Sequence, residues 1–143
     1  MGEIKQISIF AKNQPGKLEK ITRILMDTAI NIRAITISSV GDYGVIKLLV
    51  DKPQDAFDIL KKEGLTISLN EVLAIEMNDK PGGLYNIAKI LMKNNINAEN
   101  SYGFVIESEK KAVLIIEVKD IESAKQILKK ENINFFKEEE IIK

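Results

Sequence analysis

The sequence predicts an α+β protein in which one unit of strand, helix, strand, strand, helix and strand occurs twice. Three observations lead to this fold class. The chain contains an internal repeat of about 70 residues, and its hydrophobic period switches between about 2 and about 3.6 residues in a fixed order. The 143 residues are 45% apolar and 29% charged, with 8 Gly and 3 Pro, which is the balance of an ordered globular chain.

The repeat is visible when the chain is shifted by 66 residues, and by 68 residues after the central hairpin. Three pairs of matching segments are Pro15-Gly16 with Pro81-Gly82, Ile24-Leu25-Met26 with Ile90-Leu91-Met92, and residues 59–63 with residues 127–131. The two added residues are expected in the second hairpin, around Ser108 to Lys111. We therefore place one domain in residues 1–70 and the other in residues 71–143.

Each repeat is expected to begin with a strand, a tight turn and a helix. Residues 5–11 alternate between apolar and polar side chains, as in a half-buried strand. Asn13-Gln14-Pro15-Gly16 then interrupts the alternation with turn-forming residues. Apolar side chains recur at three- and four-residue intervals over residues 17–29, which predicts an amphipathic helix.

A hairpin should follow the first helix. Residues 31–40 alternate again, and Gly41-Asp42-Tyr43-Gly44 is typical of a hairpin turn into a strand at residues 45–50. The two strands are therefore expected to be antiparallel neighbours.

A second helix and a last strand complete the repeat. Pro53 suits the first turn of that helix, Gly64 suits its end, and residues 65–69 have the pattern of a strand. Residues 72–137 show the same order. Two strand-helix-strand units with right-handed crossovers give a ferredoxin-like layer, in which the helices cover one face of an antiparallel sheet.

The composition excludes several classes of chemistry. Cys, His and Trp are absent, so a thiol nucleophile, a Ser-His-Asp triad and a disulfide framework are impossible, and neither a metal nor a cofactor is expected. Acidic and basic residues balance at 21 each without a basic block, so no nucleic acid partner is expected. No apolar run approaches the roughly 20 residues of a membrane span, and no secretory pattern is present. We expect a cytoplasmic protein that does not enter a membrane.

The turn before the first helix of each repeat is the strongest candidate site. Its two copies are Asn13-Gln14-Pro15-Gly16-Lys17-Leu18 and Asp79-Lys80-Pro81-Gly82-Gly83-Leu84. Glycine allows a ligand to approach the main chain closely, and the free N–H groups at a helix start attract a carboxylate. Asn31 and Asn97 begin the strand after this helix in both repeats. The polar side chains are thus related by the repeat, which predicts two equivalent sites.

A purely structural interpretation of these residues stays open. Asn or Asp before Pro-Gly is a common turn and helix entry, and Asn at a helix exit is a common cap. Only the combination of the residues and its recurrence favours a binding site.

The pattern resembles ACT domains, which are small amino-acid-sensing modules attached to many biosynthetic enzymes. Both repeats carry a hydrophobic strand, the motif Asn/Asp-x-Pro-Gly-x-Leu, a helix rich in Ile and Leu, and Ile-Asn-(Ile/Ala) at the start of the second strand. The resemblance covers roughly residues 4–137, and it is greatest to stand-alone tandem ACT proteins.

The resemblance implies that the two copies pair side by side in an eight-stranded antiparallel sheet with helices on one face. It further implies that an amino acid binds between the Pro-Gly loop of one copy and the second strand of the other. The matching positions are Asn13 and Asp79 for the ligand contact, Gly16 and Gly82 for the close approach, and Asn31 and Asn97 on the second strand. The remaining candidate positions are Gln14, Pro15, Lys17, Leu18, Ile32, Lys80, Pro81, Gly83, Leu84 and Ala98.

The function implied is that of a non-catalytic regulator that binds a free amino acid, forms a homodimer and acts on an enzyme of amino-acid metabolism. A ligand that bridges two copies shifts an equilibrium only through its differential affinity for the paired state. One alternative is an adaptor that binds proteins and no ligand. The other is an enzyme that uses carboxylates such as Asp79, although no carboxylate pair recurs at a common position. The identity of the amino acid and of the pathway stays open.

Overall fold

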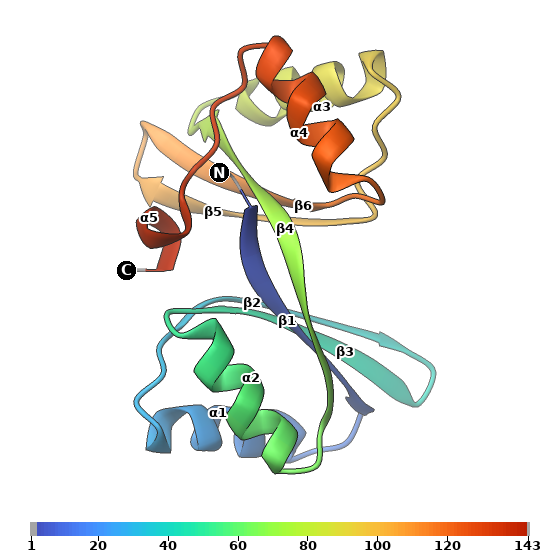
Figure 1. Ribbon diagram of the computed structural model, residues 1–143, viewed down its shortest axis with the longest axis vertical. Coiled ribbons are helices and arrows are strands. Elements are labelled where there is room, and N and C mark those ends of the chain that lie inside the picture. Colours follow the sequence, from blue (N-terminus) through green and yellow to red (C-terminus); the bar gives the residue numbers. More distant parts are fainter. Residues whose placement is uncertain (1–2, 143) are drawn as a thin grey trace. The chain divides into compact units, whose positions relative to one another are not determined.

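The first repeat folds in the order that its sequence predicts. The structure, a computed structural model, describes residues 3–142 (Figure 1). The elements in chain order are β1 (Glu3–Lys12), α1 (Lys17–Asp27), β2 (Ile32–Val40), β3 (Tyr43–Val50), α2 (Pro53–Lys62), β4 (Thr66–Asn78), α3 (Gly83–Lys93), β5 (Asn100–Glu107), β6 (Lys111–Glu117), α4 (Ile121–Lys130) and α5 (Glu138–Ile142). Most of these residues belong to one of two compact units, Lys5–Asn70 and Glu71–Ile141.

In the unit Lys5–Asn70, the strands lie in the order β2-β3-β1, and both pairings are antiparallel. Ile46 of β3 lies opposite Ile9 of β1 on one side and opposite Ile37 of β2 on the other. Directly opposed residues point to the same face of a sheet, so these three side chains share a face. Within this order β2 has a neighbour on one side only, which makes it an edge strand.

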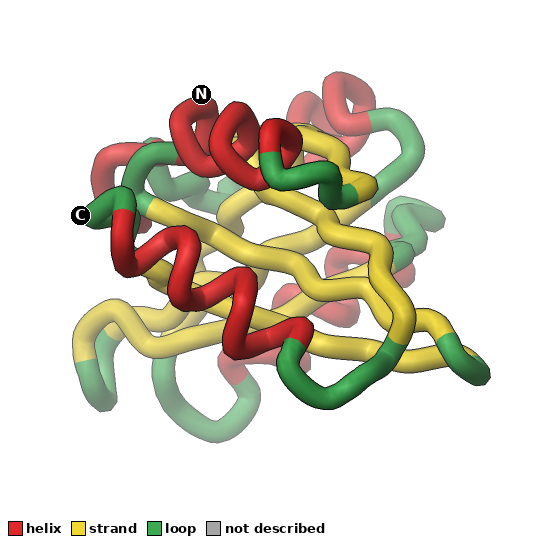
Figure 2. Tube along the Cα trace, turned by 90° about the horizontal axis from the view of Figure 1, so that it is seen from below, coloured by secondary structure: helices red, strands yellow, loops and turns green. Residues whose placement is uncertain are grey.

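Both helices of this unit pack against that face, as the sequence predicts (Figure 2). Ile21 and Leu25 of α1, together with Ala56 and Leu60 of α2, are no more than 1% exposed. Each pair is four residues apart, so each helix buries a single apolar stripe. The buried strand residues of the same core are Ile7, Ile9, Ile46, Leu48 and Val50.

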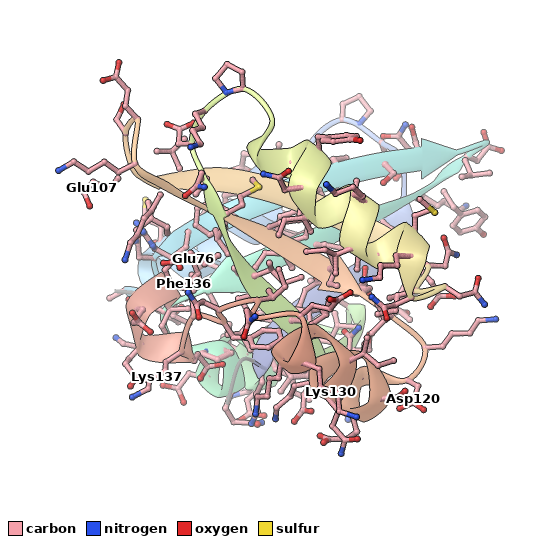
Figure 3. All side chains as sticks on the ribbon, turned by 90° about the horizontal axis from the view of Figure 1, so that it is seen from above. Glu76, Glu107, Asp120, Lys130, Phe136 and Lys137 are labelled. Carbon is pink, nitrogen blue, oxygen red and sulfur yellow. The ribbon has the colours of Figure 1, made fainter. Side chains whose placement is uncertain are left out.

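The unit Glu71–Ile141 repeats this arrangement with the strand order β4-β6-β5. Its core joins Ile87 and Leu91 of α3 and Ala124 and Leu128 of α4 to buried residues of β4 and β6. The side chain of Asp120 caps α4 by accepting the Ser123 N–H at 3.0 Å. Asp120 and Lys130, both labelled in Figure 3, stand at the two ends of α4.

The expectation of an eight-stranded sheet is wrong, because the described residues form six strands. The predicted strands at residues 65–69 and 72–77 are one continuous strand, β4. No Gly or Pro occurs between Gly64 and Pro81, so nothing in the local sequence breaks the extended backbone there.

The last strand of the second repeat is also missing. Residues near Phe135 make one isolated bridge to Ile75, with hydrogen bonds from Glu76 N–H to the Asn134 carbonyl (2.8 Å) and from Phe136 N–H to the Ala74 carbonyl (2.9 Å). The segment cannot continue as a strand because the acidic run begins α5, a helix that the sequence analysis did not predict. The Glu140 carboxylate accepts the Lys137 N–H at 2.9 Å, which satisfies a donor at the start of that helix.

No helix within residues 3–142 has both the length and the hydrophobicity that a bilayer crossing requires.

Candidate functional site

The two Pro-Gly loops have the same backbone geometry. Gly16 has φ of 91° and Gly82 has φ of 90°, in the left-handed region that glycine adopts without a steric penalty. Each glycine immediately precedes its helix. The loop residue that follows the strand is tied to the hairpin, because Asn13 N–H donates to the Asp42 carbonyl at 2.7 Å and Asp79 N–H to the Lys110 carbonyl at 3.2 Å.

In the first repeat the loop borders a cavity of about 200 Å³. Leu18 of α1, Ile37 of β2 and Ile46 of β3 are its large apolar lining residues. The full lining is Ala11, Lys12, Asn13, Gln14, Lys17, Leu18, Ile37, Gly44 and Ile46. The lining therefore combines apolar side chains with lysine and amide side chains.

In the second repeat the matching position holds a cavity of about 460 Å³ that is more open to solvent. Its lining residues are Met77, Asn78, Asp79, Lys80, Pro81, Leu84, Glu109 and Ala112. The two cavities use the same elements, namely the end of the first strand, the loop, the first helix and the start of the third strand.

The structure thus brings several predicted site residues together in each repeat. Those in the first cavity are Asn13, Gln14, Lys17 and Leu18, and those in the second are Asp79, Lys80, Pro81 and Leu84. Pro15, Gly16, Gly82 and Gly83 shape the loops and do not line these two cavities. A Cβ on Gly83 would overlap the Asn78 carbonyl oxygen, so any other residue there would require the loop to shift.

The second-strand residues lie at the other end of each first helix. Asn31 and Ile32 follow α1, whose 11 residues span about 16 Å from the loop to the far end. Asn97 and Ala98 follow α3 in the same way. Within a repeat, the loop and the second-strand asparagine therefore do not share a cavity.

Asn31 is engaged with Asp51 in the first repeat. The Asp51 carboxylate accepts the Asn31 backbone N–H at 2.9 Å, and the Asp51 N–H donates to the Asn31 carbonyl at 3.1 Å. The matching residue in the second repeat is Lys119, whose side chain cannot accept a hydrogen bond. There, β5 begins at Asn100 instead of at the counterpart of Ile32, and Asn97 lines a separate cavity of about 360 Å³ beside the start of α4.

The two loop side chains that align in sequence differ in their contacts. The Asp79 carboxylate accepts the Glu109 backbone N–H at 2.7 Å. The Asn13 side chain makes no hydrogen bond to the other residues of the described range 3–142. Asp79 therefore ties its loop to the hairpin through its side chain, and the Asn13 side chain makes no such contact.

Among the described residues, three groups outside the loop cavities, Glu76, Tyr102 and Glu131, have shifted pKa values. The Asn94 side chain, which donates to the Glu131 carboxylate at 2.7 Å, lowers the pKa of Glu131. The Asn134 side chain, at 3.0 Å, and Lys111, at 3.2 Å, hold the pKa of the Glu76 carboxyl below its usual value against partial desolvation. Burial, with a smaller contribution from Glu117, raises the pKa of Tyr102. No group of three or more acidic side chains within residues 3–142 is arranged to hold a metal ion.

Several lining residues were not predicted from the sequence. In the first repeat, strand register places three of them beside the loop, namely Ile37, Gly44 and Ile46. In the second repeat, the unpredicted lining residues include Glu109 and Ala112. The hairpin signal at Gly44 could have pointed to this position, because the loop and the hairpin lie at the same end of adjacent strands.

The fold and its two loops define a tandem pair of ferredoxin-like modules, each with a glycine loop and a cavity at the start of its first helix. The chain belongs to the ACT domain family: the family model described as an ACT domain pair matches residues 2–143.

Solved structures share this architecture. Protein BT0572 from Bacteroides thetaiotaomicron superposes with a TM-score of 0.91 at 25% identity, covering 99% of this chain and 97% of that one. The ligand-free regulatory subunit of aspartate kinase from Thermus thermophilus gives 0.62 at 19% identity, with 91% and 97% coverage. The corresponding subunit from Thermus flavus gives 0.60 at 18% identity, with 90% and 94% coverage. No curated protein matches the sequence.

Proposed function

We propose that this protein is a non-catalytic regulator that binds a free amino acid through its Pro-Gly loops, with one ACT domain in residues 1–70 and the other in residues 71–143. The observation that carries the proposal is the recurrence of a left-handed glycine, a polar loop and an adjoining cavity at the same place in both repeats. A turn needed only for folding does not require a cavity beside it.

The site has the chemistry that a small zwitterion needs. Each cavity is lined by amide and charged side chains together with apolar side chains. A few polar groups at the entrance of an apolar pocket orient a small ligand, while the wall selects its side chain. The apolar residues Ala11 and Met77 favour a ligand with a branched or aromatic side chain over a polar one.

Regulation would require a partner that responds to the ligand. The edge strand β2 exposes Ile35 (42%), Ile37 (54%) and Val40 (85%), and Ile37 also lines the first cavity. A ligand in the first cavity would change the β2 surface that a second chain or an enzyme contacts. The partner would then bind the liganded and the ligand-free protein with different affinities, and this difference couples ligand binding to association. The related aspartate kinase chains are regulatory subunits, which supports an enzyme of amino-acid metabolism as the partner. The proposal includes a non-catalytic role in the cytoplasm.

A thermal-shift screen against the twenty amino acids tests the proposal. A ligand at 100 times its dissociation constant stabilises the folded state by about 2.7 kcal/mol, which raises Tm by several degrees in a chain of this size. We expect one amino acid, or a few of similar shape, to produce this shift. The double variant Asn13→Ala and Asp79→Ala should lose the shift, and the exposed-site control Lys62→Ala should keep it. If no amino acid changes Tm, the adaptor alternative, with the exposed β2 edge as its contact surface, replaces the sensor.

A further inference from the structure

The two loop cavities differ in charge. The first is lined by two lysines, Lys12 and Lys17, and by two amides, and none of its lining residues is acidic. The second is lined by the two carboxylates of Asp79 and Glu109 and by one lysine, Lys80. The first therefore attracts an anionic group, and the second does not.

The first cavity also has, in its lining, an amide side chain without a hydrogen bond to the described residues. The Asn13 side chain makes no hydrogen bond within residues 3–142, so it can donate to a ligand oxygen. Its counterpart Asp79 already accepts the Glu109 N–H at 2.7 Å. That bond holds Glu109 at φ of 64°. The matching residue of the first hairpin is Gly41, which has φ of 62°. Asp79 thus stabilises a backbone conformation that glycine adopts freely.

The apolar walls differ by an exchange of large and small residues. In the first repeat, Ala11 lies at the end of β1 and Ile37 lines the cavity from β2. At the matching positions the second repeat has Met77 and Gly103, and the Met77 Cε lies 3.3 Å from where a Gly103 Cβ would be. Met77 therefore covers the backbone at Gly103, whereas Ala11 leaves room for a ligand tail beside Ile37.

We propose that the first-repeat cavity recognises its ligand by a carboxylate and an apolar tail and does not require the α-ammonium group. The ligand class is small apolar monocarboxylates, which includes 2-oxo acids as well as amino acids. Lys12, Lys17 and the Asn13 amide bind the carboxylate, and Leu18, Ile37 and Ile46 contact the tail. With no carboxylate in its lining, the cavity has no anionic partner for an ammonium group. This inference rests on the proposed function, because it names the ligand class of one of the two loop sites.

Calorimetric titration with three matched sets of probes tests the proposal. Each set contains an amino acid (valine, leucine or phenylalanine), the 2-oxo acid with the same tail and the amine that lacks the carboxylate. For at least one tail, the amino acid and the 2-oxo acid should bind with dissociation constants within about threefold of each other. The amine should bind at least about tenfold more weakly.

Two pairs of variants locate the site. Lys17→Gln should weaken both carboxylate probes by about tenfold, whereas Lys80→Gln in the second loop should leave them unchanged. Ala11→Met, which introduces the residue of the second repeat, should abolish binding of the leucine and phenylalanine sets, and Met77→Ala should not.

The outcomes separate this inference from the proposed function. Binding of the amine as tightly as the carboxylates, or binding that depends on Lys80 and not on Lys17, overturns the inference but leaves an amino-acid sensor in place. Binding of 2-oxo acids alone, dependent on Lys17, contradicts amino-acid sensing and also overturns the part of the inference that includes amino acids in the ligand class. If none of the nine probes binds, the inference is wrong, and the thermal-shift screen against all twenty amino acids decides the proposed function separately.

Discussion

The Asp79 carboxylate accepts a hydrogen bond from the Glu109 backbone N–H at 2.7 Å, and this bond fastens the second Pro-Gly loop to its hairpin. Both repeats also have a backbone hydrogen bond between loop and hairpin, from Asp79 N–H to the Lys110 carbonyl and from Asn13 N–H to the Asp42 carbonyl. Within residues 3–142, the Asn13 side chain adds no hydrogen bond to the one in its repeat. Two loops of the same shape are therefore held by different means.

This difference predicts that alanine substitution at Asp79 lowers the free energy of unfolding more than alanine substitution at Asn13. Asp79→Ala should lower the free energy of unfolding by about 1–2 kcal/mol, because it removes a charge-assisted hydrogen bond at an exposed turn. Asn13→Ala should change it by less than about 0.5 kcal/mol, because the side chain has no partner to lose. Urea denaturation of the ligand-free protein measures both. Equal costs would show that the Asp79 bond does not hold the hairpin.

The contact between Asn31 and Asp51 predicts a second asymmetry. Asp51→Ala should destabilise the protein by about 1–2 kcal/mol, since the Asn31 N–H then loses its acceptor at the start of β2. The matching variant Lys119→Ala should have an effect within about 0.5 kcal/mol. Hydrogen exchange of the Asn31 amide reports the same change locally, and an unaltered exchange rate in Asp51→Ala would contradict the assignment.

Replacing glycine at position 83 should destabilise the second loop. A methyl group there meets the Asn78 carbonyl oxygen, so Gly83→Ala should cost about 1–3 kcal/mol as the loop shifts. The first repeat has Lys17 at this position, and Lys17→Ala should leave stability within about 0.5 kcal/mol of the wild type. Thermal unfolding of both variants is a direct comparison, and full stability of Gly83→Ala would mean that the loop adapts freely.

Glu76 should make stability depend on pH in the acidic range. Its folded-state pKa lies below the ordinary value of 4.5, chiefly because of Asn134, so the folded state binds the proton less readily than the unfolded state. The stabilising contribution is therefore complete above about pH 4.5 and is lost as pH falls through the lower folded-state pKa.

Denaturation curves between pH 6 and pH 3 should accordingly show a smaller loss of stability for Glu76→Gln than for the wild type. Asn134→Ala should also reduce the loss, because it removes the largest cause of the shift. An identical pH dependence in all three proteins would contradict the role of Glu76.

The repeated architecture could be predicted because it depends on local patterns. Period and turn residues located the four longer helices within a few residues, and the Pro-Gly motif located both loops. The number of strands could not be predicted in this way. Whether the extended backbone continues through Asn70 and Glu71, and whether residues near Phe135 pair along a full strand, depends on contacts with distant segments.

The candidate site was predicted only in part, for a related reason. The loop residues carry a motif, but Ile37 and Ile46 become a cavity wall only through the register of β2 on β3. The hairpin residues Gly41 and Glu109 both have positive φ, which glycine adopts without a penalty and glutamate does not. Only Glu109 therefore needs the hydrogen bond to the Asp79 side chain, and Asn13 makes no such bond. Neither relationship is visible in the segment that contains the motif.

The most direct measurement is a ¹⁵N NMR titration of the labelled protein with the amino acid that the thermal screen identifies. The amide signals of residues 13, 14 and 16–18, together with those of Ile37 and Gly44, should shift in a saturable way, while Pro15 has no backbone N–H to report. Shifts confined to residues 94–99 and 119–123, around the separate cavity at the start of α4, would contradict the claim that the Pro-Gly loop is the binding site.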